Sequence, residues 1–359
     1  MADYPPILDG HADFLLSMEA TDRDFLEGSE QGHVDLPRAR EGNLGGIFCS
    51  VFISPVMAEM NAVGYTMKYI DDMYTLADRS EGQIRVVKTS EELDRCFEQG
   101  TFALVLHFEG AEPIGRSLRE LRTWYEAGLR SLGMVHARPN IFGNGAPLGP
   151  TDPDGRWEPQ IPGGEGAAIS RAMRRWTLPR KRTLPYEDTG LTDIGREIVR
   201  ECQLLGIVVD VSHMTDQSFW DTMGLVDRPI IASHSSVRAI SDQKRNLTDD
   251  QIRAIAKNGG TIGINFHSAF LRPDRATNPD TPLEVVADHF DYIVKLVGDE
   301  HVGFGSDFDG SIPPSELNSA AKLGNLVRIL QRRGYSEQRL ERICNGNFRR
   351  VLREAWRKD

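Results

Sequence analysis

The chain has 359 residues, which suits one elaborated barrel or two ordinary domains and exceeds one minimal core. Hydrophobic residues make up 40% of it and charged residues 26%, a composition that excludes a disordered or fibrous protein. The 53 acidic and 42 basic residues give a net charge of −11, which argues against nucleic acid or an anionic membrane as the main partner.

Other sequence features bear on the compartment. No apolar run approaches the ~20 residues that a membrane helix needs, and residues 1–10 have neither a basic n-region nor an apolar h-region. The four cysteines lie far apart without a Cys-x-x-Cys motif, which indicates reduced and mostly buried thiols. We therefore expect a cytoplasmic protein without membrane association.

Short β-rich runs alternate with helical patterns along the chain. Eight strands are predicted, over residues 7–13, 45–53, 102–109, 129–136, 207–212, 229–234, 261–266 and 301–307. A helix is predicted over 191–205 from its apolar stripe, and another between Thr248 as N-cap and Gly259 as stop signal. This alternation predicts one α/β domain over residues 1–359, a (β/α)₈ TIM barrel. The alternative, a doubly wound open sheet, lacks a Gly-x-Gly-x-x-Gly motif after its first strand.

One connection is much longer than the others. It follows the fourth predicted strand as an inserted loop at about 140–190, rich in Gly and Pro and then basic over 171–182. Structureless connections of this length are uncommon in compact domains and often act as lids or binding loops. We expect the basic segment to form one wall of a substrate site or a contact between the subunits of a homodimer.

Ionisable side chains end six of the eight predicted strands: His11 and Asp13, Glu109, His136, His213, His234 and Asp307. The C-terminal ends of barrel strands converge on one face, where active sites of this fold lie. Polar groups that converge in one pocket need partners or a cation. Imidazole and carboxylate ligands without thiolate suit divalent transition metals, so the sequence predicts a metal site.

The spacing of these residues suggests two ions. His11 and Asp13 point to the same side of a strand and can share one ion, while His213 and His234 can hold another. Two dications ~3.5–4 Å apart need an anion between them. Neither the third nor the fourth predicted strand contains a lysine that could be carboxylated, so Glu109 is the candidate bridge.

Three further histidines are weaker candidates. His33, which repeats the His-x-Asp spacing with Asp35, follows no apolar strand, so we expect it not to bind metal. His107 lies two residues before Glu109, and core packing and a supporting role at the site both remain open. His289 lies within a helical pattern and is expected to be structural.

The motifs around these residues occur together in one known family. They are DGHADFL at 9–15, HFEGAEPIG at 107–115, VDVSHMT at 209–215, ASHSSVRAI at 232–240, KRNLTDDQI at 244–252, ADHFDYI at 287–293, GFGSDFDG at 303–310 and GNFRRV at 346–351. Over nearly its whole length the chain resembles the membrane dipeptidase (renal dipeptidase) family, the M19 metallopeptidases of the amidohydrolase superfamily. It looks like a bacterial cytosolic member.

The resemblance implies a zinc-dependent dipeptidase with two Zn²⁺ per chain, bridged by Glu109 and a hydroxide that attacks the peptide bond. The implied metal ligands are His11, Asp13, Glu109, His213 and His234. The implied roles of the other residues are substrate-oxygen binding by His136, carboxylate binding by Arg245 and proton transfer by Asp307. The family often accepts a D-residue at the C-terminal position of the dipeptide.

Two alternatives remain open at this point. The same site could hydrolyse another substrate, such as an N-acyl amino acid or a lactone. The chain could instead be a non-catalytic, metal-binding barrel, although the presence of Asp307 argues against this, because no ligand role requires that residue.

Overall fold

The computed structural model describes residues 2–148 and 188–356. Eight parallel strands form a closed barrel, since β1 pairs with both β2 and β9 and the remaining neighbours pair in order around the ring. The barrel strands are β1 (Ile7–Ala12), β2 (Leu44–Phe52), β4 (Phe102–Glu109), β5 (Ser131–Gly133), β6 (Val208–Asp210), β7 (Ile231–Ala232), β8 (Thr261–Ile264) and β9 (Val302–Phe304). The predicted (β/α)₈ architecture is confirmed, whereas a single domain over 1–359 stays a prediction.

One further strand was not predicted. β3 (Ile84–Val86) pairs with Phe102–Leu104 at the start of β4, and β5 pairs with His107–Glu109 at its end. Because β2 runs along the whole opposite edge of β4, β3 lies beside the barrel and is not one of its eight strands. Three residues are too few to show an alternating pattern in the sequence.

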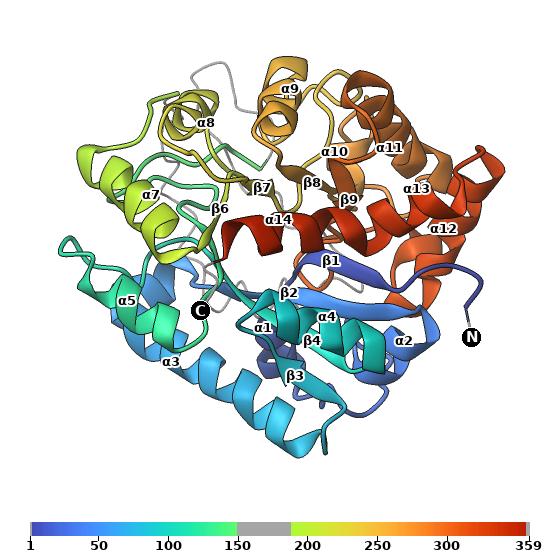
Figure 1. The fold of residues 1–359 in the computed structure, drawn as a ribbon, viewed down its shortest axis with the longest axis horizontal. Helices are drawn as coiled ribbons and strands as arrows, with labels where there is room; N and C mark the ends of the chain where they lie inside the picture. The colour runs from blue at the N-terminus through green and yellow to red at the C-terminus, as the bar shows by residue number, and fades with distance from the viewer. Residues whose placement is uncertain (1, 149–187, 357–359) are drawn as a thin grey trace.

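Helices surround the barrel (Figure 1). The α-helices are α1 (Phe14–Thr21), α2 (Leu36–Glu41), α3 (Pro55–Arg79), α4 (Ser90–Gln99), α5 (Arg119–Glu126), α7 (Asp193–Leu205), α8 (Asp216–Met223), α9 (Asp249–Lys257), α10 (Ser268–Leu271), α11 (Leu283–Val297), α12 (Leu323–Arg332), α13 (Glu337–Glu341) and α14 (Asn347–Ala355). The 3₁₀ helices η1 (Ser315–Leu317) and η2 (Ala320–Lys322) and the π-helical turn η3 (Arg342–Gly346) complete the described elements. Both predicted helices are confirmed, and Thr248 caps α9 with Gln251 in a capping box.

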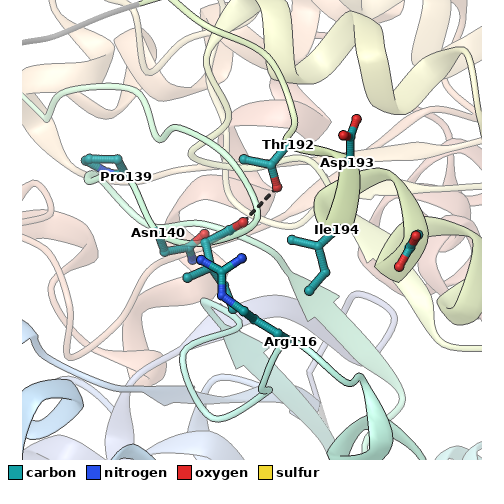
Figure 2. Close-up of a pocket in the computed structure, with 8 residues that line it drawn as sticks. Arg116, Pro139, Asn140, Thr192, Asp193 and Ile194 are labelled. Atoms are coloured by element: carbon teal, nitrogen blue, oxygen red, sulfur yellow. Dashed lines mark hydrogen bonds between the residues drawn. The ribbon is translucent and has the colours of Figure 1, made fainter.

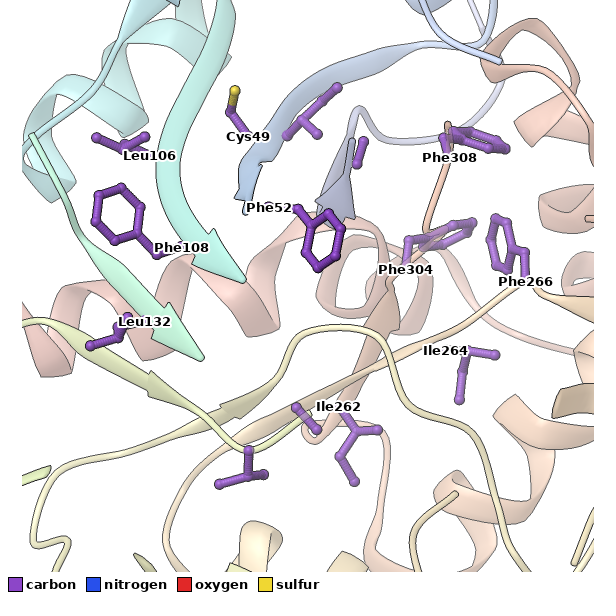
Figure 3. Packing of buried hydrophobic residues seen from close by; sticks show 14 of the residues in the cluster. Cys49, Phe52, Leu106, Phe108, Leu132, Ile262, Ile264, Phe266, Phe304 and Phe308 are labelled. Atoms are coloured by element: carbon purple, nitrogen blue, oxygen red, sulfur yellow. The ribbon is translucent and has the colours of Figure 1, made fainter. Parts of the chain in front are cut away.

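Successive side chains of β4 point to opposite faces of the strand and so lie in two layers. Leu104, Leu106 and Phe108 pack outward against the helices, and Figure 3 shows Leu106 and Phe108 among the packed hydrophobic residues. The Phe108 ring lies 5.8 Å from that of Trp124 in α5. Side chains two residues apart share a face, so His107 and Glu109 lie together on the other side of the strand, inside the barrel. The same alternation that builds the core therefore aims Glu109 at the barrel interior.

The two ends of the barrel differ. Phe348 of α14 packs among residues near the strand starts, including Leu8, Ala103 and Val208, and its ring lies 5.3 Å from that of Phe48. Figure 1 shows α14 lying across the barrel. α14 therefore closes the N-terminal end of the barrel, and the polar strand ends lie at the other.

Several predictions outside the barrel have different outcomes. All four cysteines are free and buried, as predicted. The basic segment 171–182 and most of the inserted loop lie outside the described residues. Among residues 2–148 and 188–356 no helix combines the length and apolarity needed to cross a membrane. The cytoplasmic location and the homodimer stay predictions.

Candidate metal centre

The strand ends bring the predicted ionisable side chains together at the C-terminal end of the barrel. His11 lies within β1, Asp13 follows that strand, and Glu109 is the last residue of β4. Four further side chains follow their strands by two or three residues: His136, His213, His234 and Asp307. The chain leaves each strand at the same level of the barrel, so these residues meet although they are far apart in the sequence.

Glu109 lies at the centre of this group. Its Oε1 atom lies 2.8 Å from Nε2 of His213 and 3.4 Å from Nε2 of His234. The same oxygen lies 3.7 Å from Nε2 of His11 and 3.8 Å from Nε2 of His136. The Nε2 atoms of His213 and His234 are 2.9 Å apart. One carboxylate oxygen thus faces imidazole nitrogens from four strand ends.

The donor atoms fit a metal centre. Among the residues that the structure describes, three overlapping sets have ligand atoms within 4.8 Å of one another: His11, Asp13 and Glu109; Glu109, His136 and His213; His11, His234 and Asp307. Within the described residues, neither ring nitrogen of His11 has a hydrogen-bond partner, and the same holds for Oδ1 of Asp13 and Nδ1 of His213. Unpaired buried polar atoms are costly, and a bound cation would satisfy those that face it.

The electrostatics of the cluster also favour a cation. Burial and the neighbouring Asp13 carboxylate raise the pKa of Glu109 well above its usual range. Burial opposes a charge on His11, yet the carboxylates of Glu109 and Asp13 outweigh it and raise the His11 pKa to about 10. Burial lowers the pKa values of His213 and His234 well below the usual range, so both rings are neutral at pH 7 and have a lone pair available for a metal.

Asp307 lies at the edge of the cluster. Its backbone has a positive φ of 59° and its N–H donates to the His11 carbonyl at 3.1 Å. Its Oδ2 accepts a hydrogen bond from Nδ2 of Asn265 at 3.0 Å. Burial is the main cause that raises the pKa of Asp307, to about 7, although His11 opposes the shift. A carboxyl group with this pKa can take up and release a proton near neutral pH.

Arg245 lies on the segment between β7 and α9, beside the His234 strand end. It is 3% exposed, its Nη1 donates to Ser235 Oγ and its Nη2 to the His234 carbonyl, both at 2.8 Å. Burial lowers its pKa to about 10, while Asp307 and Glu109 support the charge, so Arg245 remains a cation at pH 7. Its Nε has no partner within the described residues.

Comparisons with known proteins agree with this geometry. The family model of the membrane dipeptidases, peptidase family M19, matches residues 2–158 and 174–358. The chain belongs to the membrane dipeptidase family. Membership confirms the predicted class, a metal-dependent hydrolase that acts on dipeptides.

Similar proteins include an uncharacterized protein of the pqqA 5′ region of Klebsiella pneumoniae, 35% identical over 79% of this chain and 93% of that protein. Dipeptidase verJ of Clonostachys rogersoniana is 28% identical over 98% of this chain and 84% of that protein. A solved metallopeptidase of Rhodobacter sphaeroides, bound to a phosphinate mimic of the dipeptide L-Ala-D-Ala, is 30% identical with a TM-score of 0.84, covering 99% of this chain and 100% of that one. A solved family M19 dipeptidase is 31% identical with a TM-score of 0.85, covering 99% of each chain.

The weaker histidine candidates have other partners. Nδ1 of His33 accepts the backbone N–H of Asp309 at 2.9 Å, and Asp35 caps α2, so this pair lies apart from the three ligand sets. Nδ1 of His107 contacts Ser131 Oγ at 2.9 Å, and its ring lies 5.3 Å from that of His11. His289 accepts from the Val237 N–H and contacts the Leu271 carbonyl, a structural role as predicted.

Sequence reasoning missed Asn265, which supports Asp307. Asn265 follows β8 directly, and its Nδ2 contacts both Asp307 and the His234 carbonyl, at 3.0 and 3.4 Å. Its position at a strand end is visible in the sequence, but the Asn265 amide is not ionisable and so lacks the property that distinguishes the other strand-end residues. His267, two residues further on, accepts the Ile312 N–H at 3.0 Å, and burial followed by Arg245 lowers its pKa to about 4.

A pair outside the strand ends holds the backbone around Arg245. Arg238 donates to both carboxylate oxygens of Asp216 at 2.7 and 2.8 Å. The same guanidinium donates to the carbonyls of Lys244 and Asn246, the two neighbours of Arg245, at 3.1 and 2.8 Å. Arg238 therefore fixes the chain on both sides of Arg245, a role that sequence spacing does not reveal.

An open pocket of about 730 Å³ lies elsewhere and contains none of the strand-end residues. Arg116 lines it together with Asn140 and the start of α7, where Thr192 Oγ1 donates to the Ile141 carbonyl at 2.7 Å (Figure 2). Its other lining residues are Pro139, Asp193, Ile194 and Glu197. The pocket is therefore separate from the candidate metal centre.

Proposed function

We propose that the chain is a zinc-dependent dipeptidase with two metal ions per chain, and that it accepts a D-residue at the C-terminal position. The observation that carries the proposal is the position of Glu109 Oε1, 2.8 Å from the His213 nitrogen and 3.7 Å from the His11 nitrogen. One carboxylate can serve ions on both sides. His11 and Asp13 would hold one ion, His213 and His234 the other, and Glu109 would bridge them.

The chemistry divides between the ions and the side chains. A pair of zinc ions, when bound by these residues, would supply a hydroxide nucleophile at neutral pH and would polarise the scissile carbonyl. His136, whose side chain is 17% exposed, would donate to the carbonyl oxygen as charge develops there. Asp307 would take up a proton at its carboxylate and deliver it to the departing amine.

Arg245 would select the substrate. It would bind the terminal carboxylate of the dipeptide through charge-assisted hydrogen bonds. A carboxylate held one residue past the scissile bond explains a preference for dipeptides over longer peptides. The Rhodobacter sphaeroides relative binds a mimic of L-Ala-D-Ala, which supports the proposed acceptance of a C-terminal D-residue.

A substrate panel tests the proposal. The purified protein, loaded with zinc, is assayed on L-Ala-L-Ala, L-Ala-D-Ala, D-Ala-D-Ala, N-acetyl-alanine and a simple lactone. We expect L-Ala-D-Ala to be hydrolysed much faster than N-acetyl-alanine and the lactone. A chelator should abolish this hydrolysis, and added zinc should restore it. Preference for the acyl amino acid or the lactone would overturn the substrate assignment, and zinc binding without hydrolysis of any compound would favour a non-catalytic barrel.

A further inference from the structure

Beneath the metal centre, a buried aspartate joins β1 to the segment after β9. Asp9 pairs with Phe304 in the sheet and accepts from the backbone N–H of Ser306, two residues further on, at 2.8 Å. The other oxygen of Asp9 accepts the Ser306 hydroxyl, and the first oxygen also accepts the His11 N–H at 3.4 Å. Asp9 therefore connects the residue before Asp307 to the strand that carries His11.

The same arrangement recurs on β6 and β7. Asp210 pairs with Ile231 and accepts from the N–H of Ser233, again two residues further on, at 2.9 Å. Its second oxygen accepts the Ser233 hydroxyl at 2.5 Å, and its first also accepts the Ser212 N–H at 2.9 Å. Asp210 therefore connects the residue before His234 to the strand end that carries His213.

The two serine hydroxyls have different second partners. Ser306 Oγ accepts the backbone N–H of Phe308 at 3.0 Å, so this hydroxyl orders the chain around Asp307. Ser233 Oγ lies 2.7 Å from Nδ1 of His234. Since the single Ser233 proton goes to Asp210, Nδ1 of His234 must donate, which leaves the Nε2 lone pair directed at Glu109 and His213. A carboxylate behind a ligating histidine fixes its tautomer and orientation.

Glycines make room for the second arrangement. A Cβ atom at Gly10, Gly263 or Gly305 would lie 2.4, 2.1 or 2.2 Å from the Ser233 carbonyl oxygen. The segment after β7 therefore passes against β1, β8 and the residue that follows β9 inside the barrel, at a distance that only glycine allows. This close approach brings Ser233 to Asp210 and the His234 ring to the barrel axis.

We propose that Asp9–Ser306 and Asp210–Ser233 are two matching carboxylate–serine clamps, each of which positions one half of the metal centre. The first clamp aligns His11 with Asp307, and the second aligns His234 with His213. These four are positioning residues, since they act through the ligands and through Asp307. Burying two carboxylates is costly, and each of them accepts three hydrogen bonds from the described residues at the strand ends that bear the site. The proposal rests on the proposed two-metal function.

Site-selective metal binding tests the clamps. Stepwise zinc dissociation constants are measured by chelator competition for wild type, Ser233→Ala and Ser306→Ala, each alone and in a His213→Ala background that keeps only the His11–Asp13 ion. Removal of an outer-shell partner typically costs about 10–100-fold in metal affinity. In that background Ser306→Ala should weaken the remaining ion by about this factor, and Ser233→Ala should leave it within about threefold. With His213 present, Ser233→Ala should weaken the other ion.

The matched control is Ser50→Ala, which removes a buried β2 hydroxyl that has no hydrogen-bond partner within the described residues. Melting temperatures of the metal-free proteins show whether each variant folds. Asp210→Asn keeps the shape of the side chain and should weaken the same ion as Ser233→Ala. Equal weakening of both ions by either serine variant, or no change beyond that of Ser50→Ala, would overturn the proposal. Fewer than two ions in wild type would instead refute the proposed function.

Discussion

Replacement of Arg245 by methionine tests how the substrate is selected. The guanidinium has five N–H groups, of which two donate to residues that the structure describes, Ser235 Oγ and the His234 carbonyl. Nε–H and one proton on each terminal nitrogen remain for a carboxylate. A hydrogen bond to a charged group contributes ~1.5–3 kcal/mol, so two of them account for ~3 kcal/mol or more. Arg245→Met should therefore lower kcat/KM for L-Ala-D-Ala by roughly a hundredfold or more.

The assay compares L-Ala-D-Ala with its C-terminal amide. The amide lacks the carboxylate, so its kcat/KM should change by less than about threefold in the variant. The control is Arg253→Met, which removes an exposed guanidinium from α9 and should alter neither substrate. Equal losses on the acid and the amide would show that Arg245 supports the fold and does not bind the carboxylate.

Further predictions concern the metal ions, the proton transfer by Asp307 and the segment that carries Arg245. His213→Ala should bind about one zinc per chain by elemental analysis where wild type binds two; two in both would refute the ligand assignment. Asp307→Asn should keep its metal and lose about 10²–10⁴-fold in kcat, and more than a tenth of wild-type kcat would place proton transfer elsewhere. Arg238→Met should raise KM for L-Ala-D-Ala and spare the amide, as a weaker version of the Arg245 effect. Against the opposing effect of burial, hydrogen bonds from Arg238 hold the pKa of Asp216 below its usual range. This stabilisation is present above about pH 4 and is lost as the pH falls. The free energies of unfolding of wild type and Arg238→Met, measured in urea, should therefore converge below that pH.

Much of the barrel could be predicted because hydrophobic alternation reports burial directly. Every predicted strand overlaps a barrel strand, but the structure ends most of them earlier, as in β5, which covers Ser131–Gly133 of the predicted 129–136. The apolar run continues past the last ladder hydrogen bond because the chain remains buried as it leaves the barrel. Burial sets the pattern and strand pairing sets the boundary, and only burial is visible in the sequence.

The candidate site was predictable to the extent that it consists of ionisable residues at strand ends. The fold brings His11, Glu109 and His213 together as that reasoning expected. Residues that hold them, such as Asp9 and Asn265, depend on partners nearly 300 and about 40 positions away. Such contacts follow from strand order in the closed ring and leave no local spacing in the sequence.

Zinc titration of the metal-free protein, with L-Ala-D-Ala hydrolysis followed at each addition, tests the central claim most directly. The two-ion centre bridged by Glu109 predicts that activity rises until about two equivalents per chain are bound and then stays constant. Full activity at one equivalent would contradict the account, as would two bound equivalents without hydrolysis of the dipeptide.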